Sequence, residues 1–173
     1  KRVTGKFGVL DIINSGSAME LDSETISEIR KVVKDKCIHT IWFEAHYMYR
    51  HRLADFARQF QPAVVKFRCG VETFDPTLRA NWHKGIPPHI TPEDIARHFQ
   101  GLCLLCCTDT PGDTRERLLQ DIELAEKYFE YYSINVFCHN STSIRCNDEM
   151  LRWFKSEVCP TLQKSAKAEV LIE

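Results

Sequence analysis

The sequence lacks an apolar run long enough to cross a membrane. Its longest such run, Leu102 to Cys107, is far shorter than the roughly 20 residues that a membrane-spanning helix needs. No basic segment followed by an apolar one opens the chain, so nothing in it indicates secretion. Long linkers and low-complexity segments are also absent. These absences favour a single globular domain over residues 1–173, without membrane contact.

The chain also lacks an excess of either charge. With 23 basic and 24 acidic residues, the formal net charge is -1. No global field therefore draws the protein toward nucleic acid or anionic lipid. The basic residues Arg50-His51-Arg52, Lys66 and Arg68 remain a candidate patch for a phosphate or RNA, although such a group is more often a solvated face.

The eight cysteines do not indicate a disulfide framework. Several lie in apolar segments typical of core strands, where free cysteine behaves as a small buried hydrophobe. This pattern favours a reducing, cytoplasmic setting. Cys103 and Cys106 have the spacing of a metal or redox pair, but residues three apart on a strand point to opposite faces. We therefore predict that this pair is structural.

Apolar strands and amphipathic helices alternate along the chain. The predicted strands span 7–13, 39–44, 64–69, 102–107, 133–138 and 169–172. Helices are predicted to begin at Asp22 or Ser23, at Leu53 and at Thr91-Pro92, and to span 76–82, 115–128 and 148–158, with Pro160 ending the last. Strands that are apolar throughout are expected in a parallel sheet covered by helices. Six units fall short of an eight-fold barrel, so we predict an α/β fold, a partial (β/α)6 TIM-like barrel with a parallel sheet.

The stretch from Val65 to Asp75 is central to the functional prediction. It begins as a strand, is expected to break at Gly70, and places Glu72 at the strand's carboxyl end. Asp75-Pro76 then predicts a helix start. In folds of repeated strand–helix units, ligands bind at this edge of the sheet.

Polar residues follow the other predicted strands at equivalent positions. The set comprises Ser15, Gly16, Ser17, Glu44, His46, Glu72, Thr108, Asp109, His139 and Asn140. Such a ring suits a polar ligand with hydroxyl and charged groups. Its carboxylates and imidazoles are also metal ligands, so a zinc- or manganese-dependent isomerase or hydrolase is an alternative. The lack of further carboxylates at the later strand ends counts against that alternative.

Four segments, in this order, resemble the radical S-adenosylmethionine (radical SAM) superfamily. They are Ile12-Ile13-Asn14-Ser15-Gly16-Ser17, then Phe43-Glu44, then Gly70-Val71-Glu72-Thr73-Phe74-Asp75 with Lys84-Gly85 downstream, and Pro111-Gly112-Asp113-Thr114. The resemblance covers nearly the whole chain. It is closest to the branch with the elongator catalytic subunit, the tRNA methylthiotransferases and oxygen-independent coproporphyrinogen oxidase.

The resemblance implies a role for each matched position. Ser15, Gly16 and Ser17 match a turn that binds the amino group of SAM, and Glu44 matches a glutamate that bonds the ribose hydroxyls. Glu72 stands where the family presents a polar side chain to SAM. Lys84 stands where a basic residue meets the SAM carboxylate. The chemistry agrees, because a carboxylate suits a ribose diol and a lysine suits a carboxylate.

The family's cluster motif is missing from this sequence. Three cysteines spaced Cys-x-x-x-Cys-x-x-Cys hold a [4Fe–4S] cluster in the superfamily, with SAM on the fourth iron, and no such triple occurs here. The resemblance implies that the first strand–helix unit and the cluster ligands lie upstream of Lys1, in a longer protein. That protein would cleave SAM to a 5′-deoxyadenosyl radical that acts on an unknown substrate. This chain alone is expected to be inactive, and a non-catalytic binding module is a further alternative.

Overall fold

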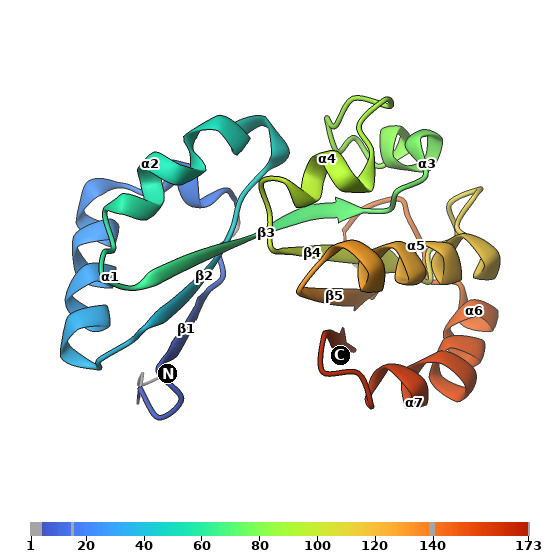
Figure 1. The fold of residues 1–173 in the computed structure, drawn as a ribbon. Helices are drawn as coiled ribbons and strands as arrows, with labels where there is room; N and C mark the ends of the chain where they lie inside the picture. The colour runs from blue at the N-terminus through green and yellow to red at the C-terminus, as the bar shows by residue number, and fades with distance from the viewer. Residues whose placement is uncertain (1–4, 15, 139–140, 173) are drawn as a thin grey trace. The chain divides into compact units, whose positions relative to one another are not determined.

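The structure is a computed structural model that describes residues 5–14, 16–138 and 141–172. Within these residues, six strands follow one another in the sheet in chain order (Figure 1). They are β1 (Val9–Ile12), β2 (Thr40–Glu44), β3 (Val64–Glu72), β4 (Gly101–Cys106), β5 (Tyr131–Val136) and β6 (Ala168–Leu171). The pairs β1–β2, β2–β3, β4–β5 and β5–β6 are parallel.

Helices connect each strand to the next. They are α1 (Ser23–Asp35), α2 (Leu53–Arg58), α3 (Pro76–Asn81), α4 (Pro92–Ala96), α5 (Arg115–Tyr128), α6 (Asp148–Trp153) and α7 (Cys159–Leu162). Short 3-10 helices span Ala18–Glu20 and Tyr47–Arg52, and a π-helical turn spans Phe154–Val158. Parallel strands in chain order with helical crossovers have the topology of a partial TIM-like barrel, which confirms the predicted fold class.

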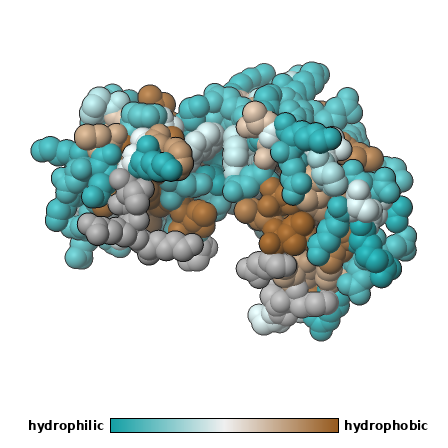
Figure 2. Space-filling view, turned by 90° about the horizontal axis from the view of Figure 1, so that it is seen from below, coloured by the Kyte–Doolittle hydropathy of each residue, from teal (hydrophilic) through white to brown (hydrophobic). Residues whose placement is uncertain are grey.

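The chain divides into two compact units, Lys1–Cys69 and Gly70–Glu173, and β3 runs across their boundary. The single domain expected over residues 1–173 stays a prediction. Hydrophilic residues cover most of the face shown in Figure 2, in keeping with 27% charged residues. In the described part of the chain, no helix is both long and apolar enough to cross a membrane.

The core of the first unit is an aromatic cluster on one face of β2 and β3. The Phe43 ring lies 5.2 Å from that of Phe56 on α2 and 6.3 Å from that of Phe67 on β3. Burying each such side chain stabilises the fold by about 1.5–3 kcal/mol. Strand alternation puts Trp42 and Glu44 on the opposite face, where the register pairs them with Lys66 and Arg68.

The core of the second unit combines apolar packing with a buried ion network. Leu118 and Ala125 of α5 are fully buried, and α5 contacts β4 and β5. On the same helix, Arg117 donates to Asp121 Oδ2 at 2.9 Å and pairs with Asp113. The two carboxylates hold the pKa of Arg117 above its usual value, whereas burial raises the pKa of Asp121.

Three local predictions were wrong. The apolar segment 7–13 was expected to be a core strand, but only Val9–Ile12 form β1 and none of these four residues is buried, because β1 is the first strand of the sheet. Gly70 does not break β3, which continues to Glu72. Pro160 does not end the helix, because the π-helical turn lets it occupy the first turn of α7, where no amide donor is needed.

All eight cysteines are free. Cys103 and Cys106 are both buried in β4, as expected for structural residues. The contact with Cys107, together with burial, raises the pKa of the Cys106 thiol well above its ordinary value.

Candidate functional site

An ion pair lies at the carboxyl end of β3. Lys84 Nζ donates to Glu72 Oε1 at 2.8 Å, and the two side chains are 28% and 15% exposed. Glu72 is the last residue of β3 and has a φ of 66°, a left-handed conformation that non-glycine residues seldom adopt. The pair is therefore part-buried and is carried on an unusual backbone.

The turn after α3 fixes the backbone that carries Lys84. Asp75 caps α3 by accepting the Leu78 amide at 2.7 Å. After the helix, the Lys84 amide donates to the Arg79 carbonyl at 3.2 Å, and His83 and Gly85 both have positive φ. This sharp turn brings Lys84 back to the end of β3, although 12 residues separate it from Glu72.

Gly70 borders the same ion pair. A Cβ added at Gly70 would lie 3.6 Å from Glu72 Oε1 and 3.7 Å from Lys84 Nζ. Both distances are ordinary van der Waals contacts, so the surface of β3 at Gly70 lies directly beside the charged atoms. A ligand group placed against this backbone would meet the carboxylate and the ammonium together.

In the first unit, Ser17 ties the ends of β1 and β2 together. Its hydroxyl oxygen accepts the amides of Met19 and His46, each at 3.4 Å, and the residue is 6% exposed. It caps the 3-10 helix Ala18–Glu20. Gly16, next to it, is exposed, and an added Cβ there would meet Glu20 Oε2 at 2.6 Å. Ser15 lies outside the described residues.

Glu44 and His46 stand at the end of β2. Glu44 is the last strand residue and is half-buried. His46 caps the 3-10 helix Tyr47–Arg52, since its Nδ1 accepts the Met48 amide at 3.1 Å. One imidazole nitrogen is thus occupied by a structural bond, which fixes the orientation of the ring.

The solvated basic face expected for Arg50-His51-Arg52, Lys66 and Arg68 was wrong at Arg68. Arg68 is 3% exposed, pairs with Asp11 and lies 5.6 Å from the centre of the Trp42 ring. Lys66 lies 5.5 Å from the centre of the same ring. Strand alternation directs both cations to the face of β3 opposite the aromatic cluster. On that face both lie over the Trp42 ring, and Arg68 also pairs with Asp11. Arg68 is therefore not a surface contact for RNA.

The polar residues after β4 are held by other parts of the second unit. The Thr108 amide and hydroxyl both donate to Asp113 Oδ2, at 2.7 and 2.8 Å. Asp109 Oδ1 accepts the Arg145 amide at 2.8 Å. These residues shape the loop, and we assign them no ligand. His139 and Asn140 lie outside the described residues.

The ion network behind this loop was missed at the sequence level. The network has helical spacing, because Arg117 lies four residues after Asp113 and four residues before Asp121. This spacing places the three side chains on one face. That spacing was the available signal. Asp121 also accepts the Phe74 amide at 2.9 Å, so the network anchors the segment that follows Glu72.

A solved structure matches this chain in both sequence and fold. No protein-family model and no curated protein matches the sequence. Among solved structures, the queuine lyase from Clostridium spiroforme bound to SAM and queuine matches with a TM-score of 0.90 and 35% identity. The match covers 98% of this chain and 72% of the lyase. Queuine lyase is a radical SAM enzyme.

This chain belongs to the radical SAM superfamily.

The residues of this superfamily member do not fit a [4Fe–4S] cluster. The sequence has no Cys-x-x-x-Cys-x-x-Cys. In residues 5–14, 16–138 and 141–172, no group of three or more His, Cys, Asp or Glu side chains is arranged to hold a metal ion. The zinc- or manganese-dependent alternative stays a prediction, and one of its candidate ligands, His139, lies outside these ranges.

Proposed function

We propose that this chain is the SAM-binding part of a radical SAM enzyme. The observation that carries the proposal is the match in sequence and fold, over 98% of the chain, to an enzyme whose structure contains SAM. Because the chain spans 72% of that enzyme, the activity of the whole protein is part of the proposal. The cluster ligands are placed outside these 173 residues, and we assign no cleavage step to the residues present.

We assign the carboxylate of SAM to Lys84. Its ammonium carries three N–H donors, one of which binds Glu72, and an ammonium binds a ligand carboxylate by a charge-assisted hydrogen bond. The Glu72 carboxylate has acceptor sites besides the one that Lys84 occupies, and these suit the donor groups of SAM. Both residues therefore keep their mutual contact while they bind the ligand.

We assign the amino group of SAM to the turn that contains Gly16 and Ser17. An ammonium needs acceptors, and the Ser17 hydroxyl oxygen already accepts two amides. The backbone carbonyls of the turn are then the better acceptors for the amino group. In this assignment the Ser17 hydroxyl holds the turn in place, whereas the resemblance implied that it contacts SAM.

We assign the ribose hydroxyls to Glu44. A half-buried carboxylate at a strand end accepts two hydrogen bonds from a diol, as in other nucleotide-binding folds. The substrate is proposed to be queuine or another guanine-like base, because the matched enzyme is bound to queuine. The closer relation to the elongator, methylthiotransferase and coproporphyrinogen oxidase branch stays a prediction.

Calorimetry on the full-length protein with its cluster assembled tests the proposal. Lys84→Met should weaken SAM binding by about 1–3 kcal/mol, the range for a lost hydrogen bond to a charged group. Lys164→Met, an exposed lysine of the same unit, removes the same charge and should leave the affinity unchanged. Equal affinities in all three proteins would refute the assignment of Lys84, and a wild-type protein that does not bind SAM would refute the function.

A further inference from the structure

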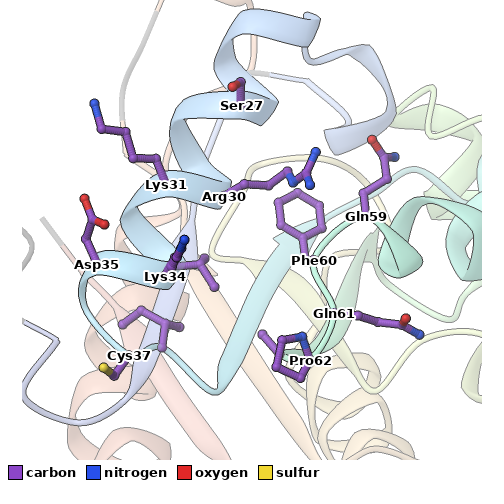
Figure 3. Close-up of a pocket in the computed structure, with 13 residues that line it drawn as sticks. Ser27, Arg30, Lys31, Lys34, Asp35, Cys37, Gln59, Phe60, Gln61 and Pro62 are labelled. Carbon is purple, nitrogen blue, oxygen red and sulfur yellow. The ribbon is translucent and has the colours of Figure 1, made fainter.

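A cavity lies in the first unit, away from the ends of β1 and β2 that carry Ser17 and Glu44. It is a groove of about 830 Å³ between α1 and the connection from α2 to β3, Gln59 to Ala63 (Figure 3). Ile38 and Ala63, which line it, lie two residues before β2 and one residue before β3. The groove therefore opens at the amino ends of these strands, and its volume is within the range of about 300–1,000 Å³ typical of small-molecule sites.

The groove has an apolar floor and a polar, basic rim. Its buried floor consists of Val33, Ile38, Phe60 and Ala63, none of them more than 9% exposed. The exposed residues that line the groove are Ser27, Arg30, Lys31, Lys34, Asp35, Cys37, Gln59, Gln61 and Pro62, which include three cations and one carboxylate. In Figure 3, Arg30 extends from α1 toward Phe60 and Gln59, whereas Lys31 and Asp35 extend to the other side of the helix.

The stability of α1 does not explain this cluster of cations. Among the described residues, no carboxylate lies within 4.0 Å of the charged nitrogens of Arg30, Lys31 or Lys34. Arg30 and Lys34 are four residues apart, a spacing at which like charges destabilise a helix. Lys34 complements the helix dipole in the last turn, but the dipole acts only within that turn and does not reach Arg30.

We propose that this groove binds an organic phosphate of about the size of a nucleoside monophosphate. The Arg30 guanidinium offers a planar fork of donors that matches phosphate oxygens, and Lys34 adds a point charge. Ser27, one turn before Arg30, supplies a hydroxyl on the same helix face. The amides of Gln59 and Gln61 offer donors and acceptors to a base or sugar on the opposite wall.

The direction of α1 orients the ligand. The negative end of the helix dipole and the Asp35 carboxylate both lie in the last turn of α1, so a phosphate is disfavoured there. The donors of Arg30 and Ser27 lie earlier in the helix, away from this negative end. The organic part then lies over the apolar floor toward Ile38 and Phe60. This site is independent of the proposed SAM residues, and its occupant carries a negative charge that SAM as a whole does not.

Titration of the protein with AMP, followed by NMR or calorimetry, tests the proposal. AMP should bind saturably, adenosine at least about tenfold more weakly, and added salt should weaken AMP binding because the contact is ionic. The double variant Arg30→Gln/Lys34→Gln should lose at least about tenfold in AMP affinity. Lys31→Gln, the matched control, should lose less than about twofold. Circular dichroism confirms that each variant is folded.

Three results would overturn the inference. They are an absence of saturable AMP binding, an equal loss in Lys31→Gln, and displacement of AMP by SAM, which would place the nucleotide in the SAM site. SAM affinity of the Arg30→Gln/Lys34→Gln variant should match that of the wild type. A failure at this groove thus leaves the proposed SAM function untouched, and a failure of SAM binding leaves this groove untouched.

Discussion

Lys84 Nζ lies 2.8 Å from Glu72 Oε1, and the carboxylate in this pair belongs to a residue with a φ of 66°. A left-handed conformation costs a non-glycine residue about 1–2 kcal/mol. Strained residues of this kind persist where the surrounding structure holds them, and they cluster at ligand sites. The strain and the ion pair occur at the strand end to which we assign SAM. The positive φ of Glu72 therefore supports Glu72 and Lys84 as ligand-binding residues, independently of the family match.

Because the backbone at Glu72 is strained, we predict that glycine at this position gives a more stable protein than alanine. Glu72→Ala and Glu72→Gly both remove the ion pair, but only glycine relieves the positive φ. Glu72→Gly should therefore be more stable than Glu72→Ala by about 1 kcal/mol, whereas glycine in a strand is ordinarily the less stable by about 0.5–1 kcal/mol. Urea denaturation of both variants measures the difference. If Glu72→Ala is the more stable protein, the backbone at this position is not strained.

The buried network on α5 predicts a large loss of stability. Arg117→Met leaves Asp113 and Asp121 buried without their cation, and breaking such a pair costs about 3–5 kcal/mol. Arg115→Met, on the same helix, breaks an exposed pair with Glu149 and should cost at most about 1 kcal/mol. Thermal and urea denaturation compare the two. Similar losses would show that the network is no more important than a surface ion pair.

We predict that the free energy of unfolding decreases at alkaline pH because of Tyr132. Its ring is fully buried and its hydroxyl donates to Glu126 Oε1 at 2.9 Å; burial, with Glu126, raises the pKa of this phenol. The folded protein therefore keeps the proton at a pH where the unfolded chain, with a tyrosine pKa of about 10, releases it. The stability contributed by this shift is complete below pH 10 and decreases above it, by up to about 1.4 kcal/mol per pH unit.

Urea unfolding at several pH values from 8 to 11 measures this decrease. Tyr132→Phe should flatten the dependence, since the shifted phenol is gone. Tyr128→Phe removes the phenol of a half-buried tyrosine, which donates to Glu93 in an exposed hydrogen bond, and should leave the slope as in the wild type. A Tyr132→Phe protein with the wild-type slope above pH 10 would contradict the role of this group.

Local sequence signals predicted most helix starts because capping is a local interaction. Asp22, Asp75 and Thr91 accept the backbone amides three residues ahead, as their positions before the helices indicate. The contacts within the candidate site are of another kind. The Ser17–His46 bond joins residues 29 positions apart, and the Glu72–Lys84 pair depends on positive φ values at Glu72, His83 and Gly85. Neither a long-range partner nor a left-handed glutamate has a signature in a local pattern.

Ser17 provides the last prediction, because its hydroxyl joins two segments of the first unit. Ser17→Ala removes an acceptor of the Met19 and His46 amides, and the loss of such a hydrogen bond costs about 0.5–1.5 kcal/mol. Amide hydrogen exchange at His46 and Met19 should become faster relative to that of Ile41, which lies within β2. Ser23→Ala, at an exposed first residue of α1, is the control and should leave these amides unchanged. If His46 exchanges at the wild-type rate in Ser17→Ala, the hydroxyl does not hold the turn, and its assignment returns to direct contact with SAM.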